Sequence, residues 1–275
     1  MLTTVVKDTH STTAIKGRKK ILIIAGSDPT AGAGLQADLK TITALGGYGM
    51  TAVTAVTVQD TRQVKKVTPL SADLVAQQIA VCLADMGADA IKLGMLATAE
   101  IVQVVAEQLA NYPDIPVIAD PVLAGTGGGT LLDGPGRRAF MDLLLPRITL
   151  LTPNGPEAQI LTGLSVGNRQ EQEAAAHKLT QSGCSVLLTG GHLPGDPIID
   201  LLVDPSGSVA PFVSRRLTGR GFHGTGCTLT SALSVGIAHG IPHPKAVESA
   251  LAYLHRAMKG ALTLGAGQQL LYSRA

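Results

Sequence analysis

Residues 20–40 read KILIIAGSDPTAGAGLQADLK, and this stretch decides the fold class. Ile21–Ala25 is a continuous apolar run that ends at Gly26, which is typical of a buried parallel strand. Leu35–Leu45 then places apolar residues at helical spacing. A buried strand that leads through a glycine-rich loop into an amphipathic helix is the first unit of an α/β fold.

The same alternation of short apolar runs and amphipathic segments continues along the chain. Strands are predicted at Ile21–Ala25, Met50–Val58, Ala90–Leu93, Pro116–Ala119, Ile148–Leu151 and Ser185–Leu188. Helices are predicted at Leu35–Leu45, Ala72–Met86, Ala99–Leu109, Arg137–Leu144, Gln170–Gln181, Thr225–Ala238 and Pro244–Leu262, and a short one begins at Glu157–Leu161. Ile199–Val203 and Val209–Val213 flank a turn-rich tetrapeptide and predict a β-hairpin that could extend the sheet or cover a dimer face. Together they predict a central parallel sheet with helices on both faces.

Composition limits the domain count and the function class. The 275 residues are 45% hydrophobic and 15% charged, so we expect one domain over 19–275 and a polar tail over 1–18. The net charge of +2 and the aromatic content of 3% argue against a nucleic-acid partner. No apolar run approaches a membrane span. Three scattered cysteines, an odd number, argue against a disulfide framework and favour a cytoplasmic protein.

Ligands of such sheets bind beyond the carboxyl ends of the strands, so the strand-to-helix loops are the candidate site. The first loop is Gly26–Gly34, whose glycines allow close approach of a ligand to the backbone. It contains Gly32-x-Gly34-x-x-Ala37, but Ser27–Ala31 separate this pattern from the strand. The pattern is therefore weak support for a nicotinamide cofactor.

The second loop, Thr152–Glu157, has two readings. Asn154 and Glu157 have the spacing of a capping box at the start of a helix. The same two residues could order water and Mg²⁺ around nucleotide phosphates, since Mg²⁺ prefers oxygen ligands. Both readings can hold at once.

The third loop, Phe222–Thr228, opens a long helix and is rich in glycine. Unpaired backbone N–H groups at a helix N-terminus bind anions, which suits a transferring phosphoryl group. The position of Cys227 in the first turn predicts a depressed thiol pKa and a usable thiolate. A glycine-rich turn with a cysteine buried for packing would account for the same residues. A Walker-type phosphate loop is absent from the sequence.

These loops resemble the hydroxymethylpyrimidine/phosphomethylpyrimidine kinases of thiamin biosynthesis, within the ribokinase-like superfamily. The resemblance runs from about Ile21 to Leu264. It rests on the matching motifs Ala25–Thr41, Lys92–Leu96, Asp120–Val122, Thr152–Glu157, Gly190–His192 and His223–Thr228. It implies a three-layer α/β/α fold with a mostly parallel sheet and a small β-hairpin addition.

The resemblance implies a role for each matching residue. Cys227 would be the general base, in the place where most ribokinase-like sugar kinases have an aspartate, and the backbone of Gly224, Thr225, Gly226 and Cys227 would bind the anion. The pyrimidine pocket would be formed by Gln59, Asp38, Ala33, Gly26, Met95 and Val122. ATP would lie against Asn154, Glu157, Thr189, Gly191 and Asp120, with Asp120 and Glu157 near Mg²⁺ through water. A cytoplasmic homodimer is also implied.

The chain departs from the family pattern in three places, one of which is the glycine-rich stretch Thr218–Phe222, which lacks the usual polar run before the anion site. Thr189 stands where the family often has a lysine that would meet the ATP phosphates, and Arg220 could supply the missing charge. Gly265–Gln269 matches the family ending only loosely. The alternatives are therefore a pyridoxine/pyridoxal kinase on the same fold and a non-catalytic pyrimidine-binding protein, with Gln59 and Met95 favouring the pyrimidine.

Overall fold

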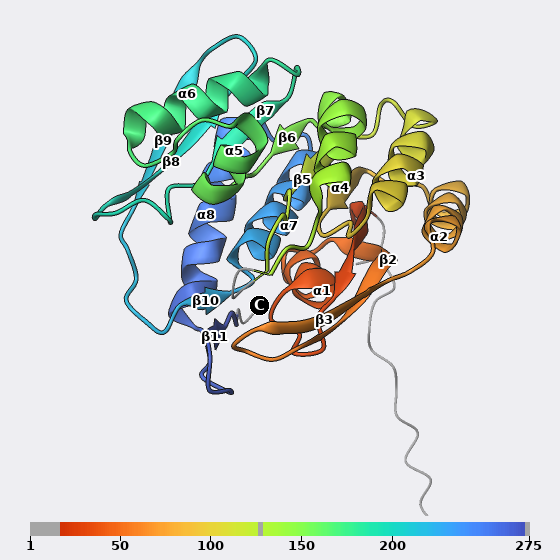
Figure 1. Ribbon diagram of the computed structural model, residues 1–275, viewed down its shortest axis with the longest axis horizontal. Coiled ribbons are helices and arrows are strands. Elements are labelled where there is room, and N and C mark those ends of the chain that lie inside the picture. The colour runs from red at the N-terminus through yellow and green to blue at the C-terminus, as the bar shows by residue number, and fades with distance from the viewer. Residues whose placement is uncertain (1–16, 126–128, 273–275) are drawn as a thin grey trace, which may run out of the picture.

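The computed structural model describes residues 17–125 and 129–272 of the protein. Within these residues the strands of the main sheet are β1 (Lys20–Ser27), β2 (Tyr48–Gln59), β3 (Val64–Pro69), β4 (Ala90–Leu93), β5 (Val117–Ala119), β6 (Leu150–Leu151), β7 (Ser185–Leu188), β8 (Ile198–Val203) and β9 (Val209–Ser214). Their order is β3-β2-β1-β4-β5-β6-β7-β8-β9 (Figure 1). All neighbours from β2 to β7 are parallel, whereas β3, β8 and β9 run antiparallel to their neighbours. The prediction of a mostly parallel sheet is confirmed.

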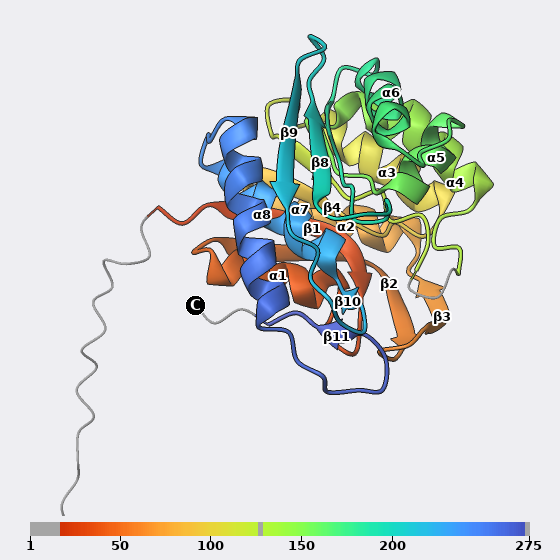
Figure 2. The same cartoon turned by 90° about the vertical axis from the view of Figure 1, so that its left-hand side faces the viewer.

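Helices cover both faces of this sheet (Figure 2). They are α1 (Gly34–Ala44), α2 (Ala72–Asp85), α3 (Ala99–Ala110), α4 (Gly134–Ala139), α5 (Gly155–Thr162), α6 (Arg169–Thr180), α7 (Thr225–Ala238) and α8 (His243–Lys259). Helices α1, α7 and α8 pack on one face, and α2 to α6 pack on the other (Figures 1 and 2). The predicted three-layer α/β/α architecture is therefore confirmed.

Strand β1 shows why its sequence is apolar without interruption. Leu22 and Ile24 belong to the core on the α2–α6 face, whereas Ile21 and Ile23 belong to the core on the α1–α7–α8 face. All four side chains are completely buried. A strand between two helical layers needs apolar residues at every position, because neither face meets water.

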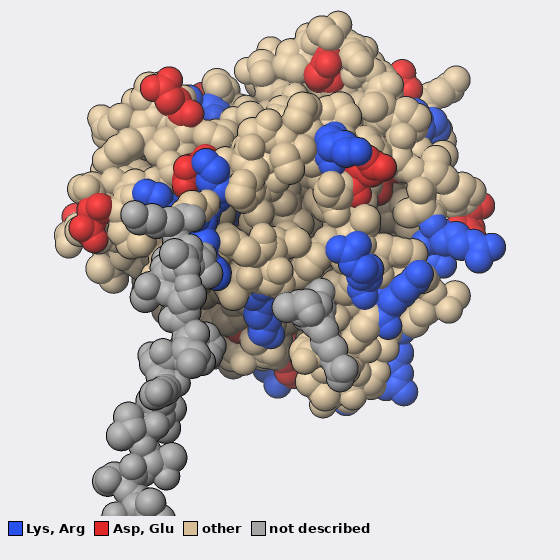
Figure 3. Space-filling view, turned by 180° about the vertical axis from the view of Figure 1, so that it is seen from behind, with Lys and Arg blue, Asp and Glu red and all other residues tan. Residues whose placement is uncertain are grey.

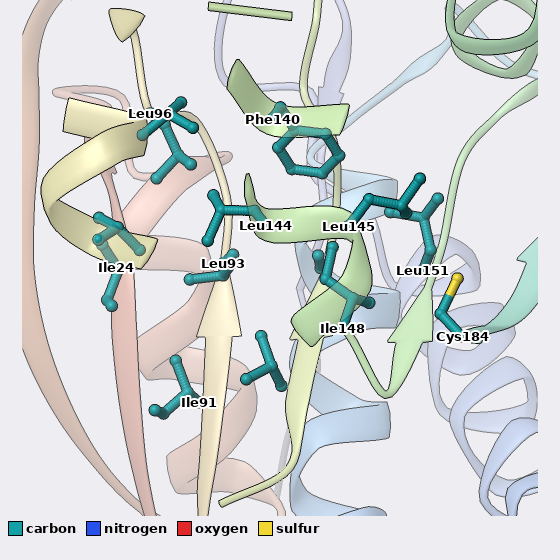
Figure 4. Close-up of a cluster of buried hydrophobic side chains, with 14 of the residues drawn as sticks. Ile24, Ile91, Leu93, Leu96, Phe140, Leu144, Leu145, Ile148, Leu151 and Cys184 are labelled. Atoms are coloured by element: carbon teal, nitrogen blue, oxygen red, sulfur yellow. The ribbon is translucent and has the colours of Figure 1, made fainter. Parts of the chain in front are cut away.

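The larger of the two cores joins strands that are distant in the sequence (Figure 4). Ile91 and Leu93 of β4 and Leu151 of β6 extend from the sheet toward Phe140, which is 2% exposed. Burial of a large apolar side chain contributes about 1.5–3 kcal/mol. This packing helps to fix the positions of β4 and β6, which flank β5 in the sheet.

The two sheet edges contain the additions to the parallel core. The predicted hairpin is present as β8 and β9, and it extends the sheet beyond β7. Strand β3, which pairs with β2 at the opposite edge, was not predicted, because its residues are half-buried or exposed and lack apolar alternation. A second, two-stranded sheet joins β10 (Phe222–His223) to β11 (Gln269–Leu270) and was also not predicted.

Three predicted boundaries are wrong. The helix expected at Arg137–Leu144 begins at Gly134 and changes at Phe140 into a π-helical turn, η2 (Phe140–Leu144), which the 3₁₀ turn η3 (Leu145–Arg147) follows. The strand expected at Ile148–Leu151 is limited to β6. The last helix ends at Lys259 and not at Leu262, because Gly260 follows.

The surface agrees with a chain of low net charge. On the face in Figure 3 most of the surface is uncharged, and the charged side chains stand in separate groups. Among the described residues, no helix is both long and apolar enough to cross a membrane. All three cysteines, Cys82, Cys184 and Cys227, are free thiols. The tail predicted over 1–18 lies almost entirely outside the described residues.

Candidate active site

A hollow of about 450 Å³ opens at the carboxyl ends of β1, β4 and β5. The strand order changes direction at β1, which lies between β2 and β4, and ligands of α/β sheets bind at such a switch point. The structure brings most of the predicted site residues to this first hollow. They are Gly26, Ala33, Gln59, Met95, Asp120, Val122, Asn154, Glu157, Gly224, Thr225, Gly226 and Cys227.

A second hollow of about 440 Å³ adjoins the first. It contains Thr189 and Gly191 as predicted, and its far side is apolar, with Leu251, Leu254 and Met258 of α8. Both hollows share the wall formed by Asp120, Asn154, Glu157, Thr225 and Gly226. Two ligands bound in these hollows would therefore meet at that wall.

The first loop, named the substrate loop (Gly26–Gly34), is ordered around a buried carboxylate. Asp28 is 1% exposed and accepts hydrogen bonds from the backbone N–H groups of Thr30 and Ala33, both at 2.8 Å. Burial alone would raise the pKa of Asp28, but the hydrogen bonds from His223, Thr30 and Ala33 outweigh it and hold the pKa below its ordinary value. These hydrogen bonds hold the loop around the carboxylate.

The same carboxylate ties the substrate loop to the anion loop (Phe222–Cys227). Oδ2 of Asp28 lies 2.9 Å from Nε2 of His223, whose side chain is buried. Next to this contact, Gly224 has φ +81° and lies so close to the substrate loop that a Cβ there would be 1.9 Å from the carbonyl oxygen of Gly32. Only glycine combines that conformation with that approach.

The anion loop opens helix α7 with unpaired backbone donors. Gly224 is the N-cap and provides no side-chain cap, and the first backbone bond within the helix runs from the N–H of Thr228 to the carbonyl of Gly224. The N–H groups of Thr225, Gly226 and Cys227 therefore have no partner within the helix. They point toward the shared wall with the positive end of the helix dipole behind them, which is an arrangement that binds anions.

The thiol of Cys227 does not have the depressed pKa predicted for it. Burial raises its pKa to about 12, and the charges of Asp38 and Asp120 add to this effect. Lys92 and the backbone N–H of Gly34 oppose it, but they do not compensate for the loss of water around the sulfur. The position of Cys227 in the first turn of a helix was not enough to predict its pKa, because the local sequence does not show that Asp38 and Asp120 lie buried near the thiol.

Asp38 was predicted to line the pyrimidine pocket, and this is wrong. It is completely buried behind the hollow, where its Oδ2 lies 2.8 Å from Nζ of Lys92 and its Oδ1 accepts a hydrogen bond from Ser231 at 2.8 Å. A carboxylate this deep requires a cation, and β4 supplies one. Lys92 in turn lines the hollow, although no role was predicted for it.

Two carboxylates in the shared wall have raised pKa values. Burial raises the pKa of Asp120 to about 6, with a further contribution from Asp38, while Lys92 acts against it. Burial also raises the pKa of Glu157 to about 8, and the charge of Asp120 adds to the rise. Burial disfavours the charged form of both carboxylates, and a divalent cation bound beside them would favour it. Among the described residues no cluster of three or more acidic, histidine or cysteine side chains forms a complete metal site.

Known proteins show what this arrangement belongs to. A profile of the phosphomethylpyrimidine kinase family matches residues 28–271. Over 249 residues the chain is 40% identical to the hydroxymethylpyrimidine/phosphomethylpyrimidine kinase of Rhizobium meliloti, and the match covers 90% of this chain and 93% of that protein. This chain belongs to the phosphomethylpyrimidine kinase family.

The chain is also similar to a longer thiamine biosynthesis protein and to a solved pyridoxal kinase. The thiamine biosynthesis bifunctional protein ThiED of Geobacter sulfurreducens is 39% identical over 251 residues, and the chain spans about half of that protein, 51% of its length. The solved pyridoxal kinase of Staphylococcus aureus in complex with AMP-PCP has a TM-score of 0.85 and 34% identity, over 92% of this chain and 93% of that one. The ribokinase-like fold is therefore confirmed.

Within this phosphomethylpyrimidine kinase, three side chains shape the deep end of the first hollow. Gln59 donates from Nε2 to the hydroxyl of Thr57 at 2.9 Å, which fixes the direction of its amide. Met95 is 8% exposed and closes the hollow from the end of β4. Val122 has φ +30°, an outlier for a β-branched residue, and such strain clusters at functional sites.

The loop of Asn154 and Glu157 confirms the capping-box reading. Asn154 accepts the N–H of Glu157 at 2.9 Å through Oδ1, and Glu157 accepts the N–H of Asn154 at 3.0 Å through Oε2. Both side chains also line the two hollows, so the cap places them at the shared wall. The phosphate-ordering role remains a proposal.

Three side chains at the two hollows, Arg215, Arg216 and His192, had no role assigned from the sequence. Arg220 lies at neither hollow, whereas Arg215 and Arg216 both line the second one. The guanidinium of Arg216 donates to the carbonyl groups of Gly191, Leu193 and Gly195 at 2.6–2.9 Å, so it shapes the loop after β7. His192 lines both hollows, although it was quoted only as part of a motif.

Proposed function

We propose that this kinase transfers the γ-phosphoryl group of ATP to the hydroxymethyl group of 4-amino-5-hydroxymethyl-2-methylpyrimidine, and then a second one to the resulting monophosphate, in thiamin biosynthesis. The observation that carries the proposal is the shared wall. It joins a hollow lined by the amide side chain of Gln59 to a second hollow of similar volume with an apolar side, and the anion loop contributes Thr225 and Gly226 to the wall between them.

The pyrimidine is proposed to occupy the first hollow. The amide of Gln59 offers a donor and an acceptor side by side, which complements the ring nitrogen and the amino group of an aminopyrimidine. Gly26 and Ala33 would approach the ring from the substrate loop, and Met95 and Val122 would contact its apolar surface. The hydroxymethyl group would then point toward Cys227.

ATP is proposed to occupy the second hollow, with its base against the apolar side of α8 and its phosphates toward the shared wall. Thr189 and Gly191 would lie along the phosphates. Arg215 would supply the charge that the family lysine provides elsewhere, since it lines this hollow and Arg220 does not.

Mg²⁺ fits the chemistry of the shared wall. Asp120 and Glu157 would hold it through water, because two carboxylates with raised pKa values provide oxygen donors and negative charge but not a full coordination shell. When bound, the ion would neutralise charge on the ATP phosphates. Asn154 would orient a water molecule beside it.

The transfer needs a base and an anion site, and we assign both. Cys227 reacts as the thiolate, formed when its own proton is released to water. It accepts the proton of the hydroxymethyl group while the hydroxymethyl oxygen forms its bond to the γ-phosphorus and the bond from that phosphorus to ADP breaks. The N–H groups of Thr225, Gly226 and Cys227, with Gly224 as the cap, donate to the transferring phosphoryl oxygens.

One experiment tests the proposal directly. The protein is incubated with Mg-ATP and hydroxymethylpyrimidine, and products are followed by mass spectrometry beside the Cys227→Ala variant and a control, Cys82→Ala, which changes a cysteine of α2 outside both hollows. Mono- and then diphosphate are expected, with a loss of at least about 100-fold in Cys227→Ala and none in Cys82→Ala. Absence of any phosphorylated product from the unmodified protein would leave a pyrimidine-binding protein.

A pyridoxal kinase is the second candidate. The Staphylococcus aureus pyridoxal kinase, which has also been solved with AMP-PCP and pyridoxal together, shares 34% identity with this chain. Parallel reactions with pyridoxal separate the two, since product from pyridoxal alone would assign the vitamin B6 reaction.

We also propose that the protein is a cytoplasmic homodimer without a nucleic-acid partner. Three free cysteines suit a reducing compartment, and a net charge of +2 offers little attraction to phosphate backbones. Light scattering after size-exclusion chromatography tests the dimer, for which a mass of one chain, 28.2 kDa, would be the contradicting result.

A further inference from the structure

The steps described so far assign no role to a buried ion pair that lies beneath the site. Lys92 of β4 and Asp38 of α1 are both completely buried, and 2.8 Å separate Nζ from Oδ2. Ser231 of α7, also completely buried, donates to the second carboxylate oxygen at 2.8 Å. These contacts connect the sheet to the two helices that follow the substrate loop and the anion loop.

The pair lies next to the reacting groups. Ser231 is one helical turn after Cys227, so the two side chains share a face of α7. Lys92 lines the first hollow together with Cys227 and Asp120, and its charge acts on both of them. An ammonium group has three N–H donors, and Asp38 accepts only one of them in the contacts described.

Stability does not account for this pair. Removing two charges from water costs several kcal/mol for each ion, and well-packed apolar residues in their place are often as stable or more so. A deeply buried lysine with a dedicated carboxylate, at the bottom of a hollow that contains a nucleophile or base, is the pattern expected of a functional charge.

We propose that Lys92 is a positioning residue for the phosphoryl transfer: held in place by Asp38 and Ser231, its ammonium stabilises the negative charge shared by the sulfur of Cys227 and the hydroxymethyl oxygen as the proton passes between them. The inference rests on the proposed function. Cys227 enters this step as the thiolate, its thiol proton having gone to water, and the ammonium of Lys92 favours that charged form against the effect of burial. The O–H bond of the hydroxymethyl group then breaks, an S–H bond forms at Cys227, and the oxygen bonds to the γ-phosphorus as ADP leaves. Lys92 keeps its proton throughout.

The burial of the neighbouring groups explains why such a charge is needed. The pKa of Cys227 is raised by burial and by Asp38 and Asp120, and Lys92 is the strongest influence in the opposite direction. Burial acts to lower the pKa of Lys92, but the negative charges of Asp38, Cys227 and Asp120 outweigh burial and raise it. Lys92 therefore stays protonated and positively charged within the site.

The test separates charge from packing with paired variants. Lys92→Met leaves Asp38 as a buried, unpaired carboxylate, so its thermal stability and its kcat should both fall. Lys92→Met/Asp38→Asn removes both charges, and the introduced amide oxygen can still accept from Ser231, so stability should return while kcat stays at least about 100-fold lower. The Kd of the pyrimidine, measured by calorimetry, should change by less than threefold.

A matched control exists on the same sheet. Lys19 and Asp89 form an ion pair at 3.1 Å near the amino end of β1, partly exposed and outside both hollows. Lys19→Met/Asp89→Asn should leave kcat unchanged. If the first double variant does not fold, Lys92→Gln/Asp38→Asn replaces it, since two amides can hydrogen-bond to each other without a charge.

Each outcome decides something. A neutral double variant with kcat within threefold of the unmodified protein would make the pair purely structural and overturn the inference, as would a Lys92→Met variant with full activity. The assays use whichever of hydroxymethylpyrimidine and pyridoxal the unmodified protein phosphorylates. If it phosphorylates neither, the proposed function itself has failed and the inference fails with it.

Discussion

Asp200 of β8 provides a test of how burial controls stability in this fold. It is 5% exposed, it borders the second hollow, and its Oδ1 accepts the backbone N–H of Gly190 at 2.8 Å. Burial raises the pKa of Asp200 from 3.8 to about 6, against the effect of that hydrogen bond. We predict that Asp200→Asn makes the protein more stable at pH 8 and not at pH 4.

The sign follows from proton binding. A carboxyl with a raised pKa in the folded state holds its proton more tightly than in the unfolded chain, so between about pH 4 and pH 6 the folded state binds more protons. The free energy of unfolding therefore falls as the pH rises through this window, and the full penalty is present above about pH 6. The asparagine variant lacks this proton and has no such penalty.

The magnitude comes from the same two values. A difference of about 2.2 in pKa corresponds to about 3 kcal/mol at 1.36 kcal/mol for each pKa unit. In Asp200→Asn the amide oxygen can still accept from Gly190, but the new NH₂ group needs a partner, which costs about 1–3 kcal/mol if none forms. We expect a net stabilisation of up to about 2 kcal/mol at pH 8 and none, or a loss, at pH 4.

Urea unfolding of both proteins without ATP at pH 4.5, 6 and 8 measures this difference. The informative quantity is the change with pH in the difference between variant and unmodified protein, since a fixed packing effect cancels from it. Asp204→Asn is the control, because the pKa of Asp204 in the exposed β8–β9 turn lies below its ordinary value, so its pH effect has the opposite sign. A difference for Asp200→Asn that stays constant from pH 4.5 to 8 would refute the reasoning.

Three further predictions concern the loops. In Gly224→Ala the alanine must adopt a left-handed conformation, which costs about 1–2 kcal/mol, and its Cβ displaces the carbonyl of Gly32. Steady-state kinetics should therefore show a loss of at least about tenfold in kcat/KM, and an unchanged kcat/KM would contradict the anion-loop geometry. Asp28→Asn weakens the contact to His223, and thermal unfolding should report a loss of about 1.5–3 kcal/mol, whereas no loss would mean that the two loops are not held by this pair. Thr189→Lys adds a cation beside the proposed phosphates, so KM for ATP should fall, and a higher KM would place the phosphates elsewhere.

The fold was largely predictable because local pattern and tertiary context agree in its core. Ile21–Ala25 is apolar at every position, and both faces of β1 are covered, so the prediction depended on burial alone. Strand β3 shows the opposite case. It lies at an edge, its Lys65 and Lys66 are exposed, and only its pairing with β2 makes it a strand. Pairing between distant segments is not visible in a local pattern.

The motifs predicted which residues lie near the site, but not the direction in which each side chain points. Twelve of the predicted site residues lie together at the first hollow, because the carboxyl ends of neighbouring parallel strands meet at one edge of the sheet. The roles assigned to them stay predictions. The position of Asp38 was predicted wrongly, because a side chain in the second turn of a helix after the loop can face either the ligand or the core. The partner that decides this, Lys92, is 54 residues away in the sequence.

The electrostatics of the shared wall explain why ATP should bind with a cation. The buried carboxylates of Asp38 and Asp120 lie near the buried ammonium of Lys92, and Glu157 lies near Asp120. Burial and the neighbouring carboxylates raise the pKa of Asp120 to about 6 and that of Glu157 to about 8. Phosphates alone would meet repulsion at this wall, and the N–H groups of the anion loop carry only partial charges. A divalent cation between phosphates and carboxylates reverses the sign of that interaction. We therefore propose that these acidic groups select a metal–nucleotide complex over free nucleotide, and that they are not a source of stability.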